Sequence, residues 1–529
     1  MLLPVLAIVL VPLTTYLFSS LYFKARQKAG GGLPASVPYL WPFIAHTGTF
    51  AAGSDTLAGA LRQHAVSGGI VRFKGIGFNF VLLSGAEFIR KALSTNHFDW
   101  NVVSAPLFGG MFGGPQKIID AIAKDNSGIG VKPYPGTDVH PGRRLMRNQV
   151  IFFSDAFSKS SLDEMVPRFV DAVEDWCKAS NIGKDWVEMP DLYLFLRDVL
   201  FDCGVVSIFG QQMLDLNPDL CKDFWEYDTN IGFLALGMPR WMRPDAPKSR
   251  DRMVASMKRW RQHALKNDKP GSSDDATWDP AWGLGAIKRR NKLLDATEGL
   301  FEEDGRASID LALIWSMTSN VIPASFWYMV EVLASKDLLK DVRDEIDREA
   351  TASVSDGRQK IDPGRLTNNA LLQAVFAETL RLHVATLITR TVKKEHTVGS
   401  WLLKKDQNLI VSSNVEHLNE QWDVPGHPAS DFEPRRFLVA PEASGGKAES
   451  FSLENRKGQW VPFGLGEHMC PGRHFAKMEM IVNAAVMFSK FDFELLTPEG
   501  WRPKNDYARY GFGTQQPAEK VPFRIRRRS

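Results

Sequence analysis

The chain contains two long stretches without a charged residue, and they predict two different kinds of helix. The first is residues 1–23, which is followed at once by Lys24, Arg26 and Lys28. As a helix it would be about 35 Å long, enough to cross the hydrocarbon core of a bilayer. A cleaved signal peptide would carry its basic residues before the apolar run and not after it. The pattern therefore predicts an uncleaved transmembrane anchor with a lumenal N-terminus and a cytoplasmic body.

The anchor is followed by a segment of different composition. Residues 24–45 are basic at their start and then rich in Gly and Pro, with the run Gly30-Gly-Gly-Leu-Pro34. Such a composition predicts a hinge and a short rigid spacer. Residues 46–529 would then form the folded body of the protein.

The second uncharged stretch runs from Leu311 to Val330, between Asp310 and Glu331. Its length alone would permit a membrane span. Several polar residues and a proline lie in its middle, however, and such groups are costly in lipid. These are Ser316, Thr318, Ser319, Asn320, Pro323 and Ser325. The pattern favours the central buried helix of a large protein, kinked where Pro323 removes a backbone hydrogen bond.

Shorter patterns predict the other elements of the body. Apolar and basic residues alternate over 71–74, and 78–83 is mostly apolar, so a strand pair is expected before a helix at Ala86–Leu93. Residues 101–140 are rich in Gly and Pro and predict a long loop. Helical spacing recurs further along the chain, over 161–180, 190–215, 250–266, 370–382 and 475–488.

Composition excludes some classes of protein. Apolar residues make up 44% of the chain and charged residues 24%, so a sizeable core is expected. The net charge of +3 is too small to suggest a nucleic-acid partner. The cysteines number four and are widely spaced, which gives no disulfide framework and fits a reducing compartment.

One of these cysteines, Cys470, lies in a stretch that predicts chemistry. Glycines and a proline precede it in a sharp turn, and the predicted helix 475–488 follows. Backbone N–H groups and the helix dipole at such a place favour a thiolate. A thiolate could be a nucleophile, half of a disulfide, a zinc ligand or a haem ligand. No second cysteine lies nearby to complete a zinc site, and neither His468 nor His474 has the flanking residues of a catalytic base.

The pattern Phe-x-x-Gly-x-His-x-Cys-x-Gly closely resembles the haem-binding loop of the cytochromes P-450. Phe463, Gly466, Cys470 and Gly472 keep the spacing of that family. The resemblance implies that Cys470 is the axial ligand of the iron of haem b. It also places His468 where a basic residue meets a haem propionate. The alternative is a free cysteine in an ordinary strand–turn–helix corner.

A second pair of motifs carries the same resemblance. The sequence Glu378-x-x-Arg381 alone would be an ordinary ion pair on one helix face, of little energetic value. It is followed by Phe432-Glu-Pro-Arg-Arg436-Phe and then by the cysteine loop, which is the order of the family signature. The resemblance implies a buried triad of Glu378, Arg381 and Arg436 that positions the haem loop.

Two further arginines match family positions that bind the haem propionates. Arg390 lies in the alternating run 387–392, and the alternative for it is an exposed strand residue. Arg144 is the weaker candidate, because His140 stands where the family motif has a tryptophan. A solvated basic face would explain Arg144 equally well.

The kink of the central helix departs from the common family pattern. Oxygenating members usually carry an acid and a threonine there, whereas this chain reads Ser319-Asn320-Val-Ile-Pro323. This resembles the branch that contains cholesterol 7α-hydroxylase and prostacyclin synthase. An amide cannot deliver a proton as a general acid, so Asn320 would need ordered water at the oxygen side. Because the branch holds a hydroxylase and an isomerase, Asn320 does not decide between them.

The resemblance covers essentially the whole chain and implies a fold and an activity. The fold would be mainly α with a smaller β lobe, preceded by the transmembrane helix. The activity would be a haem-thiolate monooxygenase of the endoplasmic reticulum membrane, with its catalytic domain in the cytoplasm. It would oxidise a lipophilic substrate, such as a steroid, terpenoid, other lipid or secondary metabolite, with O2 and electrons from NADPH–cytochrome P-450 reductase. The alternatives are an isomerase or dehydratase that needs no reductase, and a haem-binding protein without enzymatic activity.

Overall fold

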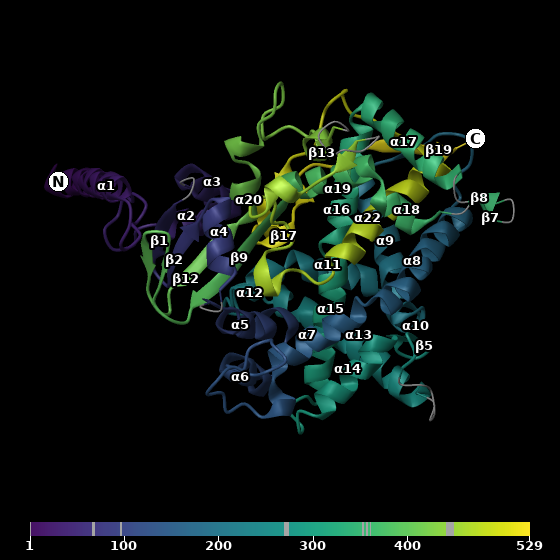
Figure 1. Ribbon diagram of the computed structural model, residues 1–529, viewed down its shortest axis with the longest axis horizontal. Helices are drawn as coiled ribbons and strands as arrows, with labels where there is room; N and C mark the ends of the chain where they lie inside the picture. Colours follow the sequence, from purple (N-terminus) through teal and green to yellow (C-terminus); the bar gives the residue numbers. More distant parts are fainter. Residues whose placement is uncertain are drawn as a thin grey trace.

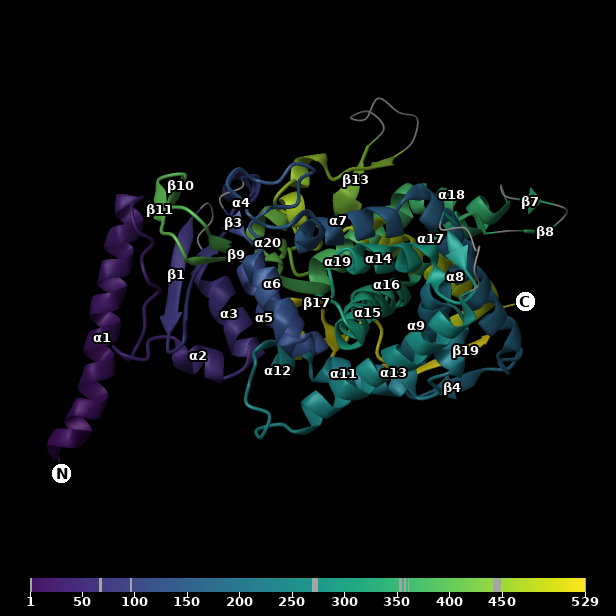
Figure 2. The same cartoon turned by 90° about the horizontal axis from the view of Figure 1, so that it is seen from below.

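The computed structural model describes residues 2–528 except 66–68, 96–97, 269–274, 352–353, 356–357, 360 and 441–448. A mostly helical body lies beside a smaller β part, and helix α1 extends along the outer side of the β part (Figures 1 and 2). The predicted fold class, mainly α with a smaller β lobe, is confirmed in this respect.

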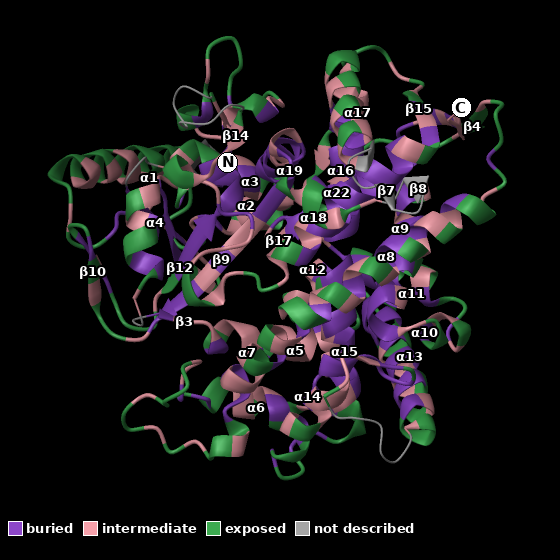
Figure 3. Ribbon diagram, turned by 45° about the vertical axis from the view of Figure 1, so that its right-hand side comes forward, coloured by how far each residue is buried: buried purple, intermediate pink, exposed green. Residues whose placement is uncertain are grey.

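The helical body is built around a broken central helix. α15 (Glu303–Thr318) and α16 (Val321–Leu333) form the predicted central element, and the break falls at Ser319 and Asn320. Every residue of α16 up to Val332 is buried, as expected for a helix that is apolar on nearly all sides. Figure 3 shows the buried residues gathered where α16 meets its neighbours. These neighbours are α9 (Leu192–Phe209), α19 (Ala370–His383) and α22 (Arg473–Lys490).

Most of the other predicted helices are present. α8 (Lys159–Ala179), α13 (Asp245–Asn267) and α4 (Ala86–Leu93) correspond to three of them. The predicted helix over 190–215 is divided, because α9 ends at Gly210 and α10 (Gln212–Asp215) follows. The remaining helices are α2 (Thr47–Ala51), α3 (Ser54–His64), α7 (Leu145–Ala156), α11 (Leu220–Thr229), α12 (Ile231–Ala235), α14 (Gly285–Asp295), α17 (Lys336–Thr351), α18 (Pro363–Asn368) and α20 (Ser413–His417).

The main sheet combines strands from both ends and the middle of the chain. β1 (Ile70–Gly75) and β2 (Phe78–Leu83) form the predicted hairpin, with Val71 opposite Leu82 and Phe73 opposite Phe80. The strand order is β1-β2-β12-β9-β17, where β12 runs parallel to β2 and antiparallel to β9. The last strands are β12 (Asn408–Ser412), β9 (Val384–Val392) and β17 (Phe512–Thr514), and β3 (Phe98–Asp99) also pairs with β9.

The chain also forms smaller sheets. A three-stranded sheet has the order β15-β19-β4. Its strands are β15 (Phe491–Leu495), β19 (Phe523–Arg527) and β4 (Val187–Met189). The two-stranded pairs are β10 (His396–Val398) with β11 (Trp401–Leu403), β13 (Leu438–Val439) with β14 (Ser450–Phe451), β16 (Asn505–Asp506) with β18 (Gln516–Pro517), β5 (Trp278–Asp279) with β6 (Gly283–Leu284), and β7 (Val354–Ser355) with β8 (Arg358–Gln359). Of these strands, β19, β7, β8 and β5 lie on the helical side of the molecule (Figure 1).

The prediction of a loop over 101–140 is wrong for its first half. α5 (Asn101–Phe112) and α6 (Gln116–Lys124) occupy it. α5 is held by tertiary contacts: Tyr227 donates its hydroxyl hydrogen bond to Met111 O at 3.0 Å, and Phe112 packs edge-on against Trp315. Packing of this kind overrides the poor helix propensity of Gly and Pro.

The predicted transmembrane anchor is also wrong. Among the residues that the structure describes, no helix is both long and apolar enough to cross a membrane. α1 does form over Leu2–Ala29, but Pro12, Thr14, Thr15 and Ser19 interrupt its apolar residues, and its last turn is basic. The single-pass placement in the endoplasmic reticulum membrane depended on this anchor and is contradicted with it.

The segment between α1 and α2 is attached to the β part. Gly32 donates its N–H to Ser400 O at 2.8 Å, and Val37 donates to Arg72 O at 2.9 Å. Arg26 of α1 bonds to the carbonyl oxygens of Gly31 and Leu33, each at 3.0 Å. The predicted hinge over 24–45 thus makes specific contacts with the edge of the sheet and with α1.

Candidate functional site

Cys470 lies in a turn between the short helix η5 (Gly466–His468) and the start of α22. Its backbone N–H donates to Phe463 O at 2.9 Å, which closes the turn. The backbone N–H groups of Gly472 and Arg473 point at the sulfur and favour the thiolate, as does the charge of Arg473. The sulfur is nonetheless enclosed by protein on most sides while it remains accessible, and this burial raises the pKa of the thiol.

The pKa of this thiol therefore reflects two opposing effects. The turn and the helix end do stabilise the thiolate, but the loss of solvation is the larger effect. A nearby cation would reverse it, because a metal ion deprotonates a thiol that ligates it. The donor set at Cys470 therefore fits an iron centre bound through sulfur.

Aromatic packing and a glycine with positive φ fix the shape of the Cys470 loop. The ring of Phe463 stacks 6.3 Å from Phe376 of α19, and Trp460 donates its indole N–H to Ala377 O at 3.0 Å. Gly466 has a φ of +75°, and a Cβ there would lie 2.4 Å from Leu93 O. A larger residue at position 466 would therefore meet both backbone strain and a steric clash.

The structure brings together the three residues of the predicted triad. Arg381 donates to both oxygens of Glu378, at 2.6 and 2.8 Å, and Arg436 donates to Glu378 Oε1 at 3.2 Å. All three side chains are fully buried. The other N–H groups of both guanidinium groups donate to backbone carbonyls. Arg381 donates to the carbonyls of His417, Ala429 and Asp431. Arg436 donates to those of Trp422, His427, Pro428 and Asp431. The triad thus fixes a long loop segment to α19.

The triad is linked to the Cys470 loop through His417, a contact that the sequence did not reveal. His417, whose carbonyl accepts from Arg381, accepts the N–H of Val461 on Nε2 at 2.9 Å. Burial and the charge of Arg381 lower the pKa of His417 to about 3, so its ring is neutral and can accept. The Trp422 ring lies 5.2 Å from the Arg381 guanidinium. Neither residue stands in a recognisable motif, so only the fold could identify them.

Arg390 lies close enough to His468 of the Cys470 loop for its charge to act on the imidazole ring. Arg390, on β9, is 7% exposed, and burial lowers its pKa to about 10. Burial and the charge of Arg390 together lower the pKa of His468 to about 4, so its ring is neutral near pH 7. The Arg390 guanidinium bonds only to Thr389 O among the described residues and lies 5.5 Å from the ring of Trp100.

This arrangement leaves a buried positive charge with little compensation. Asp99 is the carboxylate that acts on Arg390, and it also pairs with Lys393 at 3.5 Å. A buried guanidinium is stable only when an anion or strong acceptor faces it. Arg390, with the neutral N–H donor of His468 beside it, therefore fits the carboxylate of a haem propionate.

Arg144 makes its hydrogen bonds within the loop that precedes α7. Its guanidinium donates to Ser127 Oγ and to the carbonyls of Gly128, Gly130 and Val131, at distances from 2.6 to 3.3 Å. Arg144 thus holds together the loop that precedes α7. A part in propionate binding stays a prediction, since most of its donors are already used.

Asn320 stands in the break between α15 and α16, as predicted. Its Oδ1 accepts the N–H of Thr514 on β17 at 3.0 Å. The amide therefore anchors the C-terminal segment to the break. A part of Asn320 in proton delivery remains a prediction.

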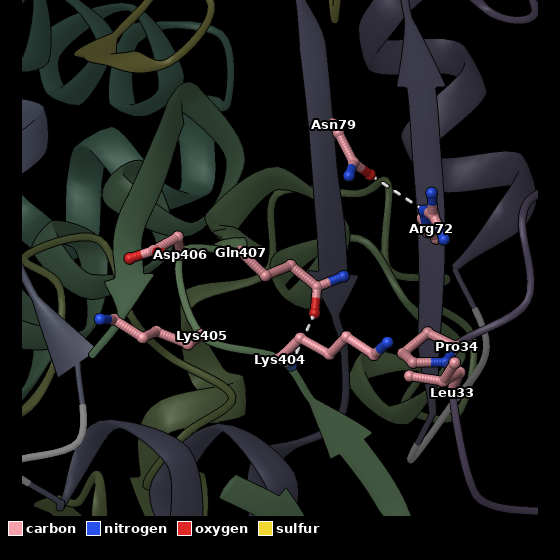
Figure 4. Close-up of a pocket in the computed structure, with 8 residues that line it drawn as sticks. All are labelled: Leu33, Pro34, Arg72, Asn79, Lys404, Lys405, Asp406 and Gln407. Carbon is pink, nitrogen blue, oxygen red and sulfur yellow. Dashed lines mark hydrogen bonds between the residues drawn. The ribbon is translucent and has the colours of Figure 1, made fainter. Parts of the chain in front are cut away.

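A surface pocket of about 330 Å³ is separate from this site (Figure 4). It is lined by Leu33, Pro34, Arg72, Asn79 and residues 404–407. None of these residues belongs to the Cys470 loop, to α19 or to the central helix. Two of its polar side chains are bonded within the pocket: Arg72 Nε donates to Asn79 Oδ1 at 2.9 Å, and Gln407 Oε1 accepts the N–H of Lys404 at 3.2 Å.

A cysteine loop ahead of a buried helix, a buried Glu–Arg–Arg triad and a broken central helix together define a haem-thiolate protein. The family model for cytochrome P450 matches residues 136–523, and the chain belongs to this family. It is 30% identical to the cytochrome P450 monooxygenase fsoE of Humicola fuscoatra, over 96% of this chain and 91% of the relative. It is 36% identical to efuG of Hormonema carpetanum over 66% of each chain. It is 27% identical to the cholesterol 7-alpha-monooxygenase of Cricetulus griseus, over 64% of this chain and 66% of the relative.

These comparisons confirm the predicted family and its enzymatic class. The chain is a cytochrome P450 monooxygenase, and this family carries a haem whose iron is bound by a cysteine thiolate. The family also implies O2, a lipophilic substrate and a reductase as redox partner.

Proposed function

We propose that this monooxygenase inserts one oxygen atom from O2 into a steroid or terpenoid, with electrons from NADPH delivered by NADPH–cytochrome P450 reductase. The similarity to a cholesterol 7-alpha-monooxygenase supports a polycyclic lipid as substrate. The observation that carries the proposal is Cys470, an enclosed but accessible thiol with two backbone N–H groups directed at its sulfur.

We assign the haem, as haem b, to the space faced by Cys470, Arg390 and His468. When bound, it supplies the activation of O2 and the transfer of oxygen to the substrate. The N–H groups of Gly472 and Arg473 stabilise charge on the sulfur of Cys470. Arg390 would pair with a propionate as a cation, and His468 would donate a neutral hydrogen bond.

The residue at the helix break also limits how protons can reach the reaction. Asn320 occupies the helix break, and its Oδ1 is already bonded to Thr514. An amide cannot act as a general acid near neutral pH. We therefore expect protons to reach the oxygen side through water held at the break and not from the side chain of Asn320.

The first experiment tests the thiolate ligand. The reduced protein is exposed to carbon monoxide, and its spectrum is compared with those of Cys470→Ser and Cys221→Ser variants. We expect the thiolate spectrum to be lost only in Cys470→Ser. An unaltered spectrum in that variant would refute the assignment.

The second experiment tests the reaction. The holoenzyme is given a library of sterols and triterpenoids with and without NADPH, reductase and O2. Products formed only in the complete mixture support the proposal. Products formed without reductase or O2 would instead identify an isomerase or dehydratase.

A further inference from the structure

The break in the central helix interrupts the backbone ladder between Ser319, which donates to Trp315 O, and Ala324, which donates to Asn320 O, and it leaves the carbonyls of residues 316–319 without their normal partners. In a continuous α-helix the carbonyl of Ser319 would accept the N–H of residue 323. Residue 323 is proline, which has no N–H. The missing donor is supplied from the far end of the chain: Arg509 Nη1 donates to Ser319 O at 2.8 Å.

Arg509 reaches the break from the short helix η6 (Tyr507–Arg509) and is 4% exposed. Its Nη2 lies 3.3 Å from Oδ1 of Asp228, a fully buried residue of α11. Burial raises the pKa of Asp228, and the charge of Arg509 opposes this rise. The buried pair therefore connects α11 with the helix break.

The carboxylate of Asp228 is itself fixed by two further donors. Trp315 of α15 donates its indole N–H to Oδ1 at 3.0 Å, and Gln516 Nε2 donates to Oδ2 at 3.4 Å. Since Trp315 precedes the break by one helical turn, Asp228 contacts both the helix and the arginine that completes it. α11, α15 and the C-terminal segment thus meet at one buried polar cluster.

The C-terminal segment makes a second attachment to the break. Thr514 donates its N–H to Asn320 Oδ1, and Gly513 approaches the same oxygen closely. Gly513 has a φ of +127°, and a Cβ there would lie 2.2 Å from Asn320 Oδ1. Only glycine permits this approach. Both residues of the break, Ser319 and Asn320, are therefore held by residues 509–514.

We propose that Arg509 is a positioning residue for the oxygen side of the reaction. It supplies the hydrogen bond that Pro323 cannot make, and this fixes the helix break in one geometry. Through Asp228 it ties that geometry to α11. The inference rests on the monooxygenase reaction proposed above, because only that reaction requires the break to hold water and O2.

A double-mutant cycle with Pro323 tests the contact itself. Asp228→Asn and Arg509→Met are combined, so that neither charge is left unpaired in the interior. This neutral pair is made with and without Pro323→Ala, which restores an N–H at the position that a continuous helix directs at Ser319 O. Hydrogen exchange of the backbone amides of 315–326 is measured in all four holoenzymes.

We expect the neutral pair to speed exchange at the break about tenfold, the effect of losing one buried hydrogen bond. In the Pro323→Ala background the same pair should change exchange by less than about twofold, because the helix supplies its own donor. Equal effects in both backgrounds would show that Arg509 does not act through Ser319 and would overturn the proposal. The cycle needs no substrate, so its failure is distinct from failure of the proposed substrate class.

The second readout concerns the reaction. The hydrogen peroxide released per NADPH oxidised is measured with reductase, O2 and cholesterol as the probe lipid. We expect the neutral pair to raise this ratio about threefold, since a loosened break positions protons and oxygen poorly. Arg502→Gln is the matched control, because Arg502 pairs with Glu331 near the far end of α16. A rise in the control equal to that in the neutral pair, or no rise in the neutral pair, would overturn the positioning role.

Discussion

Two of the buried clusters of arginine and carboxylate in this enzyme, the triad and the cluster at the helix break, differ in how completely their charges are satisfied. In the triad, one carboxylate, Glu378, accepts from two guanidinium groups whose remaining donors reach backbone carbonyls. In the cluster at the helix break, one guanidinium faces one carboxylate, and the Nε and Nη2 of Arg509 lack hydrogen-bond geometry to any described atom. The triad is thus fully bonded, whereas the break cluster is not.

This difference distinguishes the triad, which is a structural anchor, from the break cluster, whose geometry can change. A buried charge that has lost its partner lowers the free energy of unfolding, and the loss increases with the number of bonds that depend on that charge. The triad fixes α19 to the segment that leads into the Cys470 loop, so its loss should affect folding and haem binding together. The break cluster holds a local distortion, so its loss should mainly affect the geometry of α15 and α16.

The largest expected effect is that of Arg381→Met. The change removes the two-bond partner of Glu378, which keeps only the 3.2 Å bond from Arg436 among its guanidinium partners, and it leaves the carbonyls of His417 and Ala429 without this donor, so we expect a loss of about 3–5 kcal/mol in the free energy of unfolding. Urea unfolding and the amount of haem retained measure it. Arg435→Met is the control, because Arg435 is 55% exposed and pairs with Asp341 at the surface. If the two variants lose equal stability, the triad is not the anchor that its bonding indicates.

The next effect depends on pH and comes from Glu416, beside the triad. Glu416 is 1% exposed and accepts one N–H, from Gly85 at 3.1 Å, and burial raises its pKa to about 7. The folded protein therefore binds this proton more tightly than the unfolded chain, so stability falls as pH rises from about 4 to 7. Glu416→Gln should remove about 3 kcal/mol of this fall.

The measurement is urea unfolding of both proteins at pH 5 and pH 8. Relative to the wild type, Glu416→Gln should gain stability at pH 8 and gain little at pH 5. Glu420→Gln, four residues along and exposed, is the control and should behave alike at both values. A Glu416→Gln variant whose stability relative to the wild type is the same at both pH values would contradict the buried, uncompensated carboxyl.

The same comparison explains what the sequence could predict. The triad was predictable because the order of the Glu378-x-x-Arg381 motif, the motif that contains Arg436 and the Cys470 loop resembles the cytochrome P450 signature. The central helix was predictable because its apolar residues cover all faces and Pro323 marks its kink. Arg509 and Asp228 stand in no motif and lie far apart in the chain, so only the packing of α11 against the C-terminal segment brings them together. The errors have a similar cause: contacts with Tyr227 and Trp315 make α5 a helix despite its glycines.

The smallest expected effect is that of Asp228→Asn in the break cluster. Asparagine retains one acceptor oxygen, which still faces the indole N–H of Trp315 and the Arg509 guanidinium, so the losses are the ion pair with Arg509 and the 3.4 Å bond from Gln516. Since burial already raises the pKa of Asp228, the charge contributes less there than in a fully bonded cluster. We expect a loss of about 1–2 kcal/mol in the free energy of unfolding.

Asp310→Asn is the matched comparison, because Asp310 is equally buried and pairs with Arg261 and Arg290. It should lose more than Asp228→Asn, measured by urea unfolding at pH 7. The reverse order would mean that the number of arginine partners does not set the strength of these buried clusters.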